Sequence, residues 1–441
     1  MTRLLIRDVD LVDAQGKLQK AQCIAIDGTA IASVGEAEPA DFVADETLDG
    51  TDLLAMPAYF NAHCHAAMTL ERGWAEDLPF ERWLNERVWV AESALQEEDV
   101  YWGAALAACE MIRAGTVGFA DHYFWMDQVA QVVAESGMKA LLAWCWFGKD
   151  TGPEAGGITL ATTERFVERW RGAADGRIRT CLGPHSPYMC EPEALKRVVA
   201  AAERLGVGIH LHLSESREQV ATSLKRYGRS PVAHLAALGV LGLPTLAAHC
   251  SVLSEDDVKI LARQRVMVAH TPKTYLKLAM EMPPLQRLLD AKVRVALGTD
   301  GPASNADLNL LEVMRLTGLV QKSAQGKAEA MPIATLQRMA SRNGAHALGF
   351  SSSGRLAVGA AADLVLLDTR GTHWVPRHDL AASAVYASHP GDVIHVMCDG
   401  RFLMRDRVLL TLDEERIRAE AERRAFRLVG SPMRRVRAYQ P

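Results

Sequence analysis

The chain has 441 residues, of which 49% are hydrophobic and 23% are charged, so it can bury a large apolar core. Its formal net charge of -5, with no long basic run before the extreme C-terminus, argues against nucleic acid as a main partner. There is no stretch of about 18 uncharged apolar residues, and charges occur throughout the first residues, so we expect neither a membrane span nor a signal peptide. The eight cysteines are scattered without a C-x-x-C pair, which favours a reduced cytoplasmic enzyme over a disulfide scaffold.

The N-terminal segment alternates short β-type runs with turn residues. The runs are LLIRDVDLVD, QCIAIDG and AIASVG, and Gly16 marks the turn between the first two. Short runs separated by such turns are typical of antiparallel strands. This flank therefore predicts a small antiparallel sheet.

From about residue 55, strand-like apolar pieces alternate with longer helix-like ones. The predicted strands are 116–121, 140–147, 208–213, 245–249, 266–270 and 293–300. The predicted helices are 127–137, 192–205, one from Ser230 as N-cap to Leu238, 256–264, and one that ends at Leu289. This alternation indicates a parallel sheet, and about eight such units over roughly 300 residues predict a barrel.

Near residue 356 the pattern returns to short strands separated by glycine and aspartate turns, in RLAVGAAADLVLLD and VIHVMCDGRFLMRDRVLL. The two flanks could together form one β-domain beside the barrel. We therefore predict an α/β fold with a TIM-like (β/α)8 barrel over residues 57–355. A small β-sandwich is expected from residues 1–56 and 356–441.

The last predicted helix spans residues 413–428. Glu414 lies four residues before Arg418, and Glu420 lies four residues before Arg424. Pairs of opposite charge at this spacing stabilise solvent-exposed helices. We therefore expect a solvated helix on the surface.

The stretch PAYFNAHCHAAMTLERG places His63 and His65 at the end of an apolar, strand-like run. Residues i and i+2 of a strand share a face, so both imidazoles point the same way. Two buried imidazoles without partners carry a desolvation penalty of several kcal/mol. A shared metal ion removes that penalty. Taken alone, the spacing leaves satisfied core or surface histidines as the commoner alternative.

Further predicted strands end in polar residues that an apolar strand does not require. In VGIHLHLSE, His210 and His212 share a face and Glu215 follows the strand, while His249 and Asp300 end two later strands. A single strand histidine usually belongs to the core, but the C-termini of all strands in a parallel barrel open on one rim, where active sites form. Three imidazoles and a carboxylate on that rim suit zinc with an open position for water: His63, His65, His212 and Asp300.

Through these motifs the chain resembles the amidohydrolase superfamily. Within it, the chain is similar to the branch of methylthioadenosine/S-adenosylhomocysteine deaminases and chlorotriazine hydrolases. The resemblance runs over nearly the whole chain, through NAHCHAAMTLERG, ERGWAEDLPFERWL, GPHSPY, HLHLSE, AAHC, ALGTDGPASN and GRLAVGAAADLV. It implies a metal site with the ligands His63, His65, His212 and Asp300.

The resemblance also implies roles beside the metal. Glu215 would protonate a ring nitrogen of the substrate, and His249 would bind the attacking oxygen, whose proton Asp300 shares. His185, in GPHSPY, would reach the substrate, and Glu92, in VWVAE, would bind the ribose hydroxyls of a nucleoside. His210 is interpreted as a core residue or as a support behind the ligands.

Two regions depart from the pattern of this branch. Adenosine-type deaminases carry arginines after the third strand, whereas LLAWCWFGKDTGPEAGGITLATT has tryptophans and no arginine. Trp146 could stack on a flat ring, although apolar strand residues more often pack in the core. In HTPKTYLKL, Lys273 stands where relatives carry a small amide residue, and it either reaches solvent or binds an anionic group of the substrate.

We predict a metal-dependent hydrolase that acts on carbon–nitrogen bonds and deaminates a purine-, pteridine- or nucleoside-like heterocycle. One Zn2+ per chain is expected, with Fe2+ as the alternative, because His185 replaces the lysine that could be carboxylated to bridge two metals. Open alternatives keep the metal chemistry but change the bond or leaving group: a chlorohydrolase, a desulfhydrase of a thio-heterocycle, or a cyclic amide hydrolase. A non-catalytic scaffold is the alternative from another class.

The expected partner is a small heterocyclic substrate, with no nucleic acid and no membrane. We also expect a cytoplasmic homo-oligomer, either a dimer or a tetramer.

Overall fold

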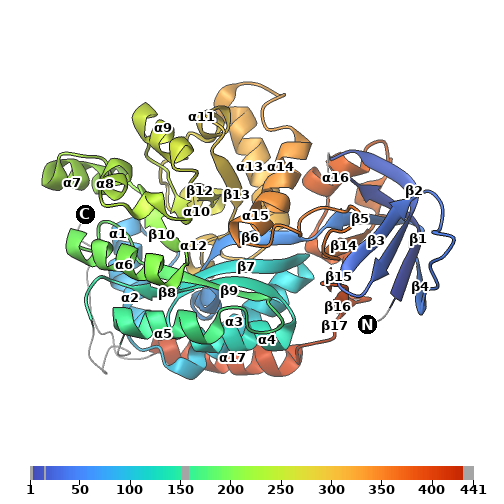
Figure 1. Cartoon of the computed structure of the whole chain (residues 1–441), viewed down its shortest axis with the longest axis horizontal. Helices are drawn as coiled ribbons and strands as arrows, with labels where there is room; N and C mark the ends of the chain where they lie inside the picture. Colours follow the sequence, from blue (N-terminus) through green and yellow to red (C-terminus); the bar gives the residue numbers. More distant parts are fainter. Residues whose placement is uncertain (1–2, 14–15, 151–157, 431–441) are drawn as a thin grey trace.

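The computed structural model describes residues 3–13, 16–150 and 158–430. Its strands form two sheets, one in the barrel and one at the right of Figure 1. The barrel sheet has eight strands in the order β13-β12-β11-β10-β9-β8-β7-β6, and all its pairings are parallel. These strands are β6 (Tyr59–Cys64), β7 (Thr116–Tyr123), β8 (Lys139–Trp146), β9 (Ile178–Pro184), β10 (Ile209–Leu213), β11 (Thr245–His249), β12 (Met267–His270) and β13 (Arg294–Leu297).

The two ends of this sheet meet through the residues that follow β13. The amides of Thr299 and Asp300 donate to the His63 carbonyl at 3.1 and 2.9 Å, and the Thr299 amide also lies 3.0 Å from Asn61 Oδ1. A Cβ at Gly298 would lie only 2.9 Å from the His63 amide nitrogen, so the approach requires glycine. The sheet is therefore nearly closed, which confirms the predicted barrel.

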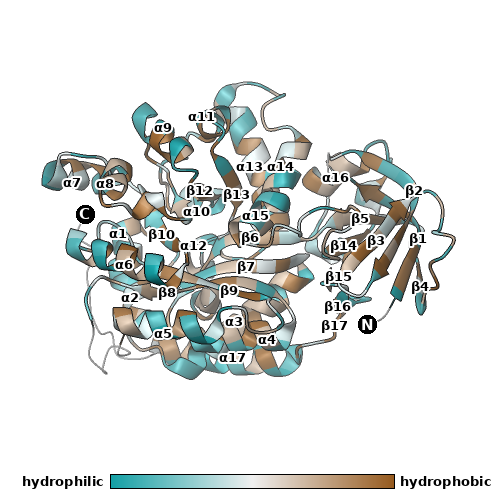
Figure 2. Cartoon of the chain, viewed as in Figure 1, coloured by the Kyte–Doolittle hydropathy of each residue, from teal (hydrophilic) through white to brown (hydrophobic). Residues whose placement is uncertain are grey.

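Helices connect the strands and cover the outside of the barrel (Figure 1). In Figure 2 these helices carry both hydrophilic and hydrophobic residues, as expected of helices that bury one face. They are α3 (Glu97–Arg113), α4 (Met126–Ser136), α5 (Leu160–Trp170), α6 (Pro192–Leu205), α7 (Arg217–Tyr227), α8 (Pro231–Ala237), α9 (Glu255–Arg263), α11 (Leu285–Asp290), α13 (Leu310–Gln325), α14 (Ile333–Ala340) and α15 (Arg342–Ala347). None of the helices in the described ranges is both long and apolar enough to cross a membrane.

Local signals explain where several helices begin and end. The predicted helix 192–205 is confirmed as α6, which starts with Pro192 and ends before Gly206 at φ 62°. The Ser230 side chain accepts from the Ala233 amide at 3.1 Å, as predicted for the N-cap of α8. The single helix expected to end at Leu289 is wrong, because two prolines, at 283 and 284, separate α10 (Pro272–Lys277) from α11.

Short helices follow β6 and β13 at the carboxyl end of the barrel. They are η1 (Ala66–Glu71), α1 (Phe80–Arg82), the π-helix η2 (Trp83–Val88), α2 (Trp89–Glu92) and α12 (Pro302–Asn305). Residues of several of them reach the cavity described below. A single-turn π-helix is rare and is often found at functional sites.

The second sheet combines both flanks of the chain in the order β17-β16-β15-β14-β5-β1-β2-β3, with β4 paired to β1. Its strands are β1 (Arg3–Val12), β2 (Leu18–Asp27), β3 (Ala30–Gly35), β4 (Glu46–Asp49), β5 (Leu53–Pro57), β14 (Leu364–Asp368), β15 (Val393–Cys398), β16 (Arg401–Arg405) and β17 (Val408–Leu409). The remaining short helices in the described ranges are η4 (Val240–Gly242), η5 (Thr372–Trp374), α16 (Leu380–Tyr386) and η6 (Pro390–Asp392).

The flanks join where β5 pairs with β14. Along β14, Leu364 and Leu366 enter a small core of the flank sheet, whereas Val365 and Leu367 enter the core of the barrel. The predicted small sandwich is thus one continuous sheet with a core of its own. The N-terminal part is mixed rather than antiparallel, because β1 pairs in parallel with β4 and β5.

The C-terminal helix α17 (Glu414–Gly430) is not the fully solvated helix that we expected. It packs against α3, next to which it lies in Figure 1, and Ile417, Ala421 and Leu428 are buried. Arg424 pairs with Asp99 of α3 at 3.1 Å and with Glu98 at 2.6 Å. Charge spacing alone could not reveal this, because an arginine that pairs within its helix looks the same in sequence as one that pairs with another helix.

Candidate active site

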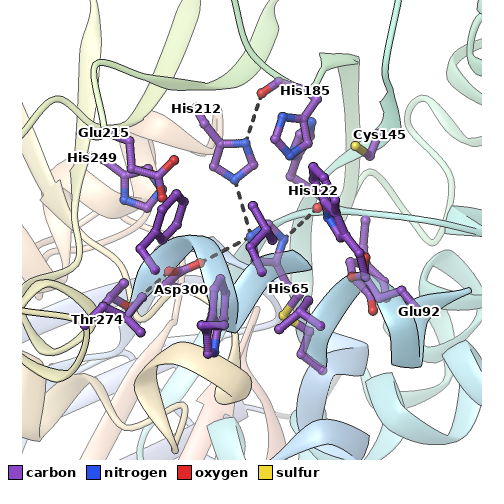
Figure 3. Close-up of a pocket in the computed structure, with 18 of the residues that line it drawn as sticks. His65, Glu92, His122, Cys145, His185, His212, Glu215, His249, Thr274 and Asp300 are labelled. Atoms are coloured by element: carbon purple, nitrogen blue, oxygen red, sulfur yellow. Dashed lines mark hydrogen bonds and ion pairs between the residues drawn. The ribbon is translucent and has the colours of Figure 1, made fainter. Parts of the chain in front are cut away.

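Five polar side chains converge at the carboxyl ends of the barrel strands. His63 and His65 come from the end of β6, His212 from β10 and His249 from the last position of β11, while Asp300 follows β13. All five are buried. Figure 3 shows His65, His212, His249 and Asp300 directed toward one another across the cavity.

Short distances link Asp300 to His63 and His65, and His65 to His212. Asp300 Oδ1 lies 3.2 Å from His65 Nε2 and 3.5 Å from His63 Nε2. His212 Nε2 lies 3.4 Å from His65 Nε2. The ligand atoms of His63, His65 and His212 all lie within 4.8 Å of one another, and so do those of His63, His249 and Asp300. Imidazoles and a carboxylate at this spacing can hold a divalent metal ion.

Backbone carbonyls fix which nitrogen of two of these rings carries the proton. His65 Nδ1 lies 2.7 Å from the His122 carbonyl, and His212 Nδ1 lies 2.9 Å from the His185 carbonyl. Because a carbonyl can only accept, both Nδ1 atoms donate, which leaves the Nε2 atoms as the ones that can bind a metal ion. This second hydrogen bond is the arrangement that orients metal-binding histidines.

His63 is oriented by another histidine. Its Nδ1 lies 3.0 Å from His210 Nε2, and its Nε2 is buried without a hydrogen-bond partner among the described residues. A buried polar atom without a partner is costly, and a metal ion would satisfy it. His210 is therefore a support behind the cluster, one of the two roles that the sequence left open, and it is not among the residues that line the cavity.

The charges of the cluster follow from burial and from Asp300. Burial lowers the pKa of His63 to about 3 and that of His212 well below its usual value, so both are neutral at pH 7, the form that binds metals. Burial also acts to lower the pKa of His65, but the adjacent Asp300 outweighs it and raises that pKa to about 9. Although burial opposes it, the adjacent imidazoles of His63 and His65 hold the pKa of Asp300 well below its usual range.

Two hydroxyl groups that the sequence analysis did not single out hold the Asp300 carboxylate. Thr274 Oγ1 donates to Asp300 Oδ2 at 3.0 Å, and Ser304 Oγ donates to the same oxygen at 2.8 Å. Thr274 belongs to α10 and Ser304 to α12, so two short helices fix the orientation of the aspartate. Ser304 lies in the ALGTDGPASN motif and could have been suspected, but Thr274 carries no sequence signal.

Glu215 and His249 form a second pair at the same rim. Glu215 Oε1 lies 3.5 Å from His249 Nε2. Glu215 Oε2 accepts from the Tyr188 hydroxyl at 2.8 Å and from Gln219 Nε2 at 3.2 Å. His249 Nδ1 lies 3.3 Å from Thr271 Oγ1. The carboxylate therefore has a fixed direction, with one oxygen left near the histidine.

The backbone at this rim adopts conformations that side chains rarely occupy. Ser214, His249, Cys250 and Asp300 have φ values of 49°, 74°, 53° and 67°. Left-handed conformations of non-glycine residues tend to gather at functional sites, where the surrounding structure maintains them. Here they turn the chain sharply as it leaves the barrel strands.

An aromatic wall surrounds the rest of the cavity. His185 stacks on Phe147 with ring centroids 4.6 Å apart, and its Nδ1 lies 2.9 Å from Ser186 Oγ. Glu92 lines the cavity from α2, on the side opposite Glu215 in Figure 3. The aromatic residues that line it are Phe80, Trp83, Trp89, Tyr123, Phe124, Phe147 and Tyr188.

Trp146 does not line this cavity, contrary to our expectation. Side chains alternate along β8, so Cys145 and Phe147 face the cavity while Trp146 points to the outer helices. There the Arg197 guanidinium of α6 lies 5.4 Å from a ring centre of Trp146. Which of these neighbouring side chains faces the cavity depends on how β8 is rotated about its own axis in the barrel. The sequence does not determine this rotation.

Lys273 also lies away from the cavity. Its ammonium pairs with Asp307 at 2.8 Å and with Glu312 at 2.6 Å, so two carboxylates already satisfy its charge. Lys273 is not among the lining residues, whereas the next residue of α10, Thr274, is. Lys273 therefore forms ion pairs within the fold and does not face the cavity, where an anionic substrate was expected to bind it.

Comparison with known proteins agrees with this architecture. The family model described as the amidohydrolase family matches residues 54–403. The 5-methylthioadenosine/S-adenosylhomocysteine deaminase of Pelotomaculum thermopropionicum is 45% identical over 434 residues, which cover 98% of this chain and 100% of that protein. An eight-stranded α/β barrel with histidines and an aspartate at its rim defines a class of metal-dependent hydrolases. The chain belongs to the amidohydrolase family, and it is a hydrolase of carbon–nitrogen bonds.

Solved structures show the same fold. A zinc-bound adenosine deaminase from Xanthomonas campestris superposes with a TM-score of 0.91 at 32% identity and covers 98% of this chain and 99% of its own. The atrazine chlorohydrolase from Arthrobacter aurescens complexed with zinc has a TM-score of 0.84 at 24% identity, over 96% of this chain and 100% of its own. The second likeness concerns the fold alone.

Proposed function

We propose that this enzyme is a zinc-dependent deaminase of a purine nucleoside, of the 5-methylthioadenosine or S-adenosylhomocysteine type. The observation that carries the proposal is the buried cluster of three imidazoles and Asp300 next to the Glu215–His249 pair. The relative that is 45% identical over its whole length is a deaminase of these nucleosides by name. The chlorohydrolase, desulfhydrase and cyclic amide hydrolase alternatives are not favoured, and an inert scaffold would have no need of this pair.

One Zn2+ per chain would be held by His63, His65, His212 and Asp300. The buried Nε2 of His63, the Nδ1–carbonyl hydrogen bonds that orient the other two rings, and the zinc in the solved adenosine deaminase support this assignment. When bound, the ion supplies Lewis-acid chemistry that makes hydroxide available near neutral pH. A single ion is favoured over two because the β9 end carries His185, not a lysine that could bridge a second metal.

The residues around the ion would move protons at defined atoms. Asp300 takes the proton that leaves the attacking water, while Thr274 and Ser304 keep its carboxylate in place. Glu215 Oε1 would deliver a proton to a ring nitrogen as the neighbouring carbon is attacked. Asp300 would then pass the proton from water to the departing amine, which leaves as ammonia, and Glu215 would regain a proton from the added hydroxyl as the carbonyl forms. His249, 3.5 Å from Glu215 Oε1, donates to the oxygen that adds to the ring.

The opposite side of the cavity would hold the nucleoside. Glu92 is a buried carboxylate that can accept hydrogen bonds from two sugar hydroxyl groups. His185, stacked on Phe147, can contact the purine. Aromatic rings on the walls favour a flat heterocycle, since stacked rings contribute about 0.5–1.5 kcal/mol per pair beyond their burial.

Ammonia release from purified, metal-loaded enzyme tests the proposal directly. 5-Methylthioadenosine, S-adenosylhomocysteine and adenosine should release ammonia, while a chlorotriazine and a thio-heterocycle should release little chloride or sulfide. Glu215→Gln serves as the matched control, because it keeps the shape of the side chain and removes its proton. Faster release of chloride or sulfide than of ammonia would overturn the proposal.

Four further expectations accompany this function. The cytoplasmic location agrees with the eight cysteines, all of which are free thiols. The homo-oligomer, a dimer or a tetramer, stays a prediction, as do the absence of nucleic acid and membrane partners.

A further inference from the structure

A second cavity, which we call the basal cavity, lies at the end of the barrel opposite the rim, and the proposed function does not use it. Its volume is about 570 Å³. It is lined by residues at the amino ends of β8 to β13 and by residues 346–349, at the end of α15 and just after it. Small-molecule sites in proteins have volumes of about 300–1,000 Å³. The basal cavity is therefore large enough for a small organic ligand.

Among the described residues, the basal cavity is lined by cations and by no acidic side chain. Arg179 is the second residue of β9, Arg265 precedes β12, and Arg294 is the first residue of β13. All three are exposed, and no described carboxylate forms an ion pair with any of their guanidinium groups. In a chain with a net charge of -5, this is a local concentration of positive charge without a counterion.

The end of α15 brings these cations to one opening. The Arg294 guanidinium donates to His346 Nε2, and Arg179 Cγ lies 3.8 Å from the position that a Cβ on Gly349 would take. His346 and Gly349 are three residues apart, so their Cα atoms lie at most about 11 Å from each other. Arg265 stands two residues before the first residue of β12, which pairs with Arg294. The three arginines therefore line one opening, not three separate patches.

His346 orients Arg294 without cancelling its charge. Because a guanidinium can only donate, His346 Nε2 accepts with its lone pair. Burial, and then the charges of Arg294 and Arg342, lower the pKa of His346, so the ring is neutral at pH 7. The Arg294 guanidinium is thus held at the opening and keeps its full positive charge.

The ligand chemistry that fits this opening is a row of linked phosphate groups. Each guanidinium binds phosphate oxygens through two parallel hydrogen bonds. A single carboxylate can pair with one arginine in this way, whereas linked phosphates present oxygens to all three. The floor is apolar, since Ile209, Leu246 and Met267 line it and are buried. An uncharged organic group attached to the phosphates can therefore lie on the floor.

We propose that the basal cavity is a binding site for a small polyphosphate, either inorganic or carried by a nucleotide. Arg179, Arg265 and Arg294 bind the phosphate oxygens, and the apolar floor contacts the organic part where the ligand has one. The inference does not depend on the proposed deaminase activity, because the basal cavity and the cavity at the rim have no lining residue in common.

A role at a helix end is the simplest alternative for Arg265. Cations near the C-terminus of a helix stabilise it, and Arg263, in the last turn of α9, is placed to do the same. Arg263 is exposed, as Arg265 is, but it does not line the basal cavity. Arg263→Gln is therefore the matched control for Arg265→Gln, because it removes the same charge from the same helix end.

Isothermal titration calorimetry of the metal-loaded full chain with sodium tripolyphosphate tests the site. The wild type should bind one tripolyphosphate per chain, with an affinity that falls as NaCl is added. Arg265→Gln and Arg294→Gln should each weaken binding by about tenfold to a hundredfold, the scale of a lost hydrogen bond to a charged group. Arg263→Gln should bind as the wild type does.

The same titrations with ATP distinguish the two sources of the phosphates. Tighter binding of ATP than of tripolyphosphate would assign its organic part to the apolar floor, and equal binding would show that the phosphates alone are recognised. In both cases Arg294→Gln should weaken binding of the two ligands alike, because it acts on the phosphates.

Three results would overturn the inference. They are no saturable binding to the wild type, an equal loss of affinity in Arg263→Gln and Arg265→Gln, and unchanged affinity in Arg265→Gln and Arg294→Gln, as binding at the rim metal would give. Melting temperatures without ligand show whether the variants fold, and Arg179→Gln, which tests the site from β9, replaces either one that does not. Failure of deamination would refute the proposed function and leave these titrations unaffected.

Discussion

Two buried clusters of this molecule each bring together side chains that can bind metals, and they solve the problem of buried charge differently. The rim cluster consists of His63, His65, His212 and Asp300. The interface cluster lies where the flank sheet meets the barrel and consists of Lys139, Ser353, Asp363, Cys398 and Asp399. The ligand atoms of Asp363, Cys398 and Asp399 lie within 4.8 Å of one another, close enough to share a metal ion, as those of His63, His65 and His212 do.

The difference lies in the lysine. Lys139 Nζ is 2.6 Å from Asp363, 2.7 Å from Asp399 and 3.2 Å from Ser353 Oγ, so an ammonium group occupies the position where a cation would bind. At the rim, no lysine or arginine lines the cavity among the described residues, and His63 Nε2 has no partner. A cluster that contains its own cation stabilises the fold, whereas a cluster of imidazoles and a carboxylate without a lysine or arginine is suited to bind a metal ion.

Removing a rim ligand should have the largest effect. His63→Ala should lose the metal and reduce turnover about a thousandfold or more, since metal-ion catalysis contributes several kcal/mol to the barrier. Cys398→Ser, in the interface cluster, should keep one ion per chain and full activity. Metal analysis of both proteins by mass spectrometry, with ammonia release measured in parallel, makes the comparison. Two ions per wild-type chain, or full activity without any, would contradict the assignment of the rim.

Glu215→Gln should separate metal binding from proton transfer. The variant should retain its metal, because Glu215 is held by Tyr188 and Gln219 and is not among the four proposed ligands. Its kcat should fall by about 10²–10⁴, the usual contribution of a positioned general acid. Metal content and single-turnover rates measure the two properties separately. A loss of metal that matches the loss of rate would place Glu215 in the metal site instead.

Lys139→Met should destabilise the fold and leave the rim intact. The substitution keeps an unbranched side chain but leaves Asp363 and Asp399 without their cation, and Asp363 is fully buried. Removing one partner of a buried ion pair lowers the free energy of unfolding by about 3–5 kcal/mol. Chemical denaturation of metal-loaded protein measures this loss, and the folded fraction should still bind one ion. An unchanged midpoint would show that the interface cluster adds nothing to stability.

The same variant carries a pH signature. Burial acts to lower the pKa of Lys139, but Cys398 and the two aspartates raise it above its usual 10.5. A group with a raised pKa gives its full stabilisation below the unfolded value and loses it as the pH rises through the folded value. The stability difference between wild type and Lys139→Met should therefore stay constant between about pH 7 and pH 9.

The sequence predicted the barrel well because its signals are local. The apolar run 245–249 and the proline and glycine that bound 192–205 each fix an element without help from the rest of the chain. The polar residues at the strand ends predicted the site at the rim, because the C-termini of all strands in a parallel barrel lie on one side. The predicted direction of Trp146 was wrong because it depends on how β8 is rotated in the barrel. That of Lys273 was wrong because its side chain is directed by carboxylates 34 and 39 residues away. The hydrogen bond from Thr274 to Asp300 could not be predicted either, because it also joins residues far apart in the sequence.

Lys273→Met should have the smallest effect, and it is the matched control for Lys139→Met. Each lysine pairs with two carboxylates, but the Lys273 side chain is 17% exposed and that of Lys139 only 4%. Partly solvated ion pairs contribute about 1 kcal/mol or less, because water already screens the charges. Denaturation of the two variants side by side should therefore show a loss several times larger at Lys139. Because Lys273 turns away from the cavity, its substitution should leave KM for a nucleoside unchanged; a loss of preference for anionic heterocycles would instead mean that the ammonium reaches the substrate.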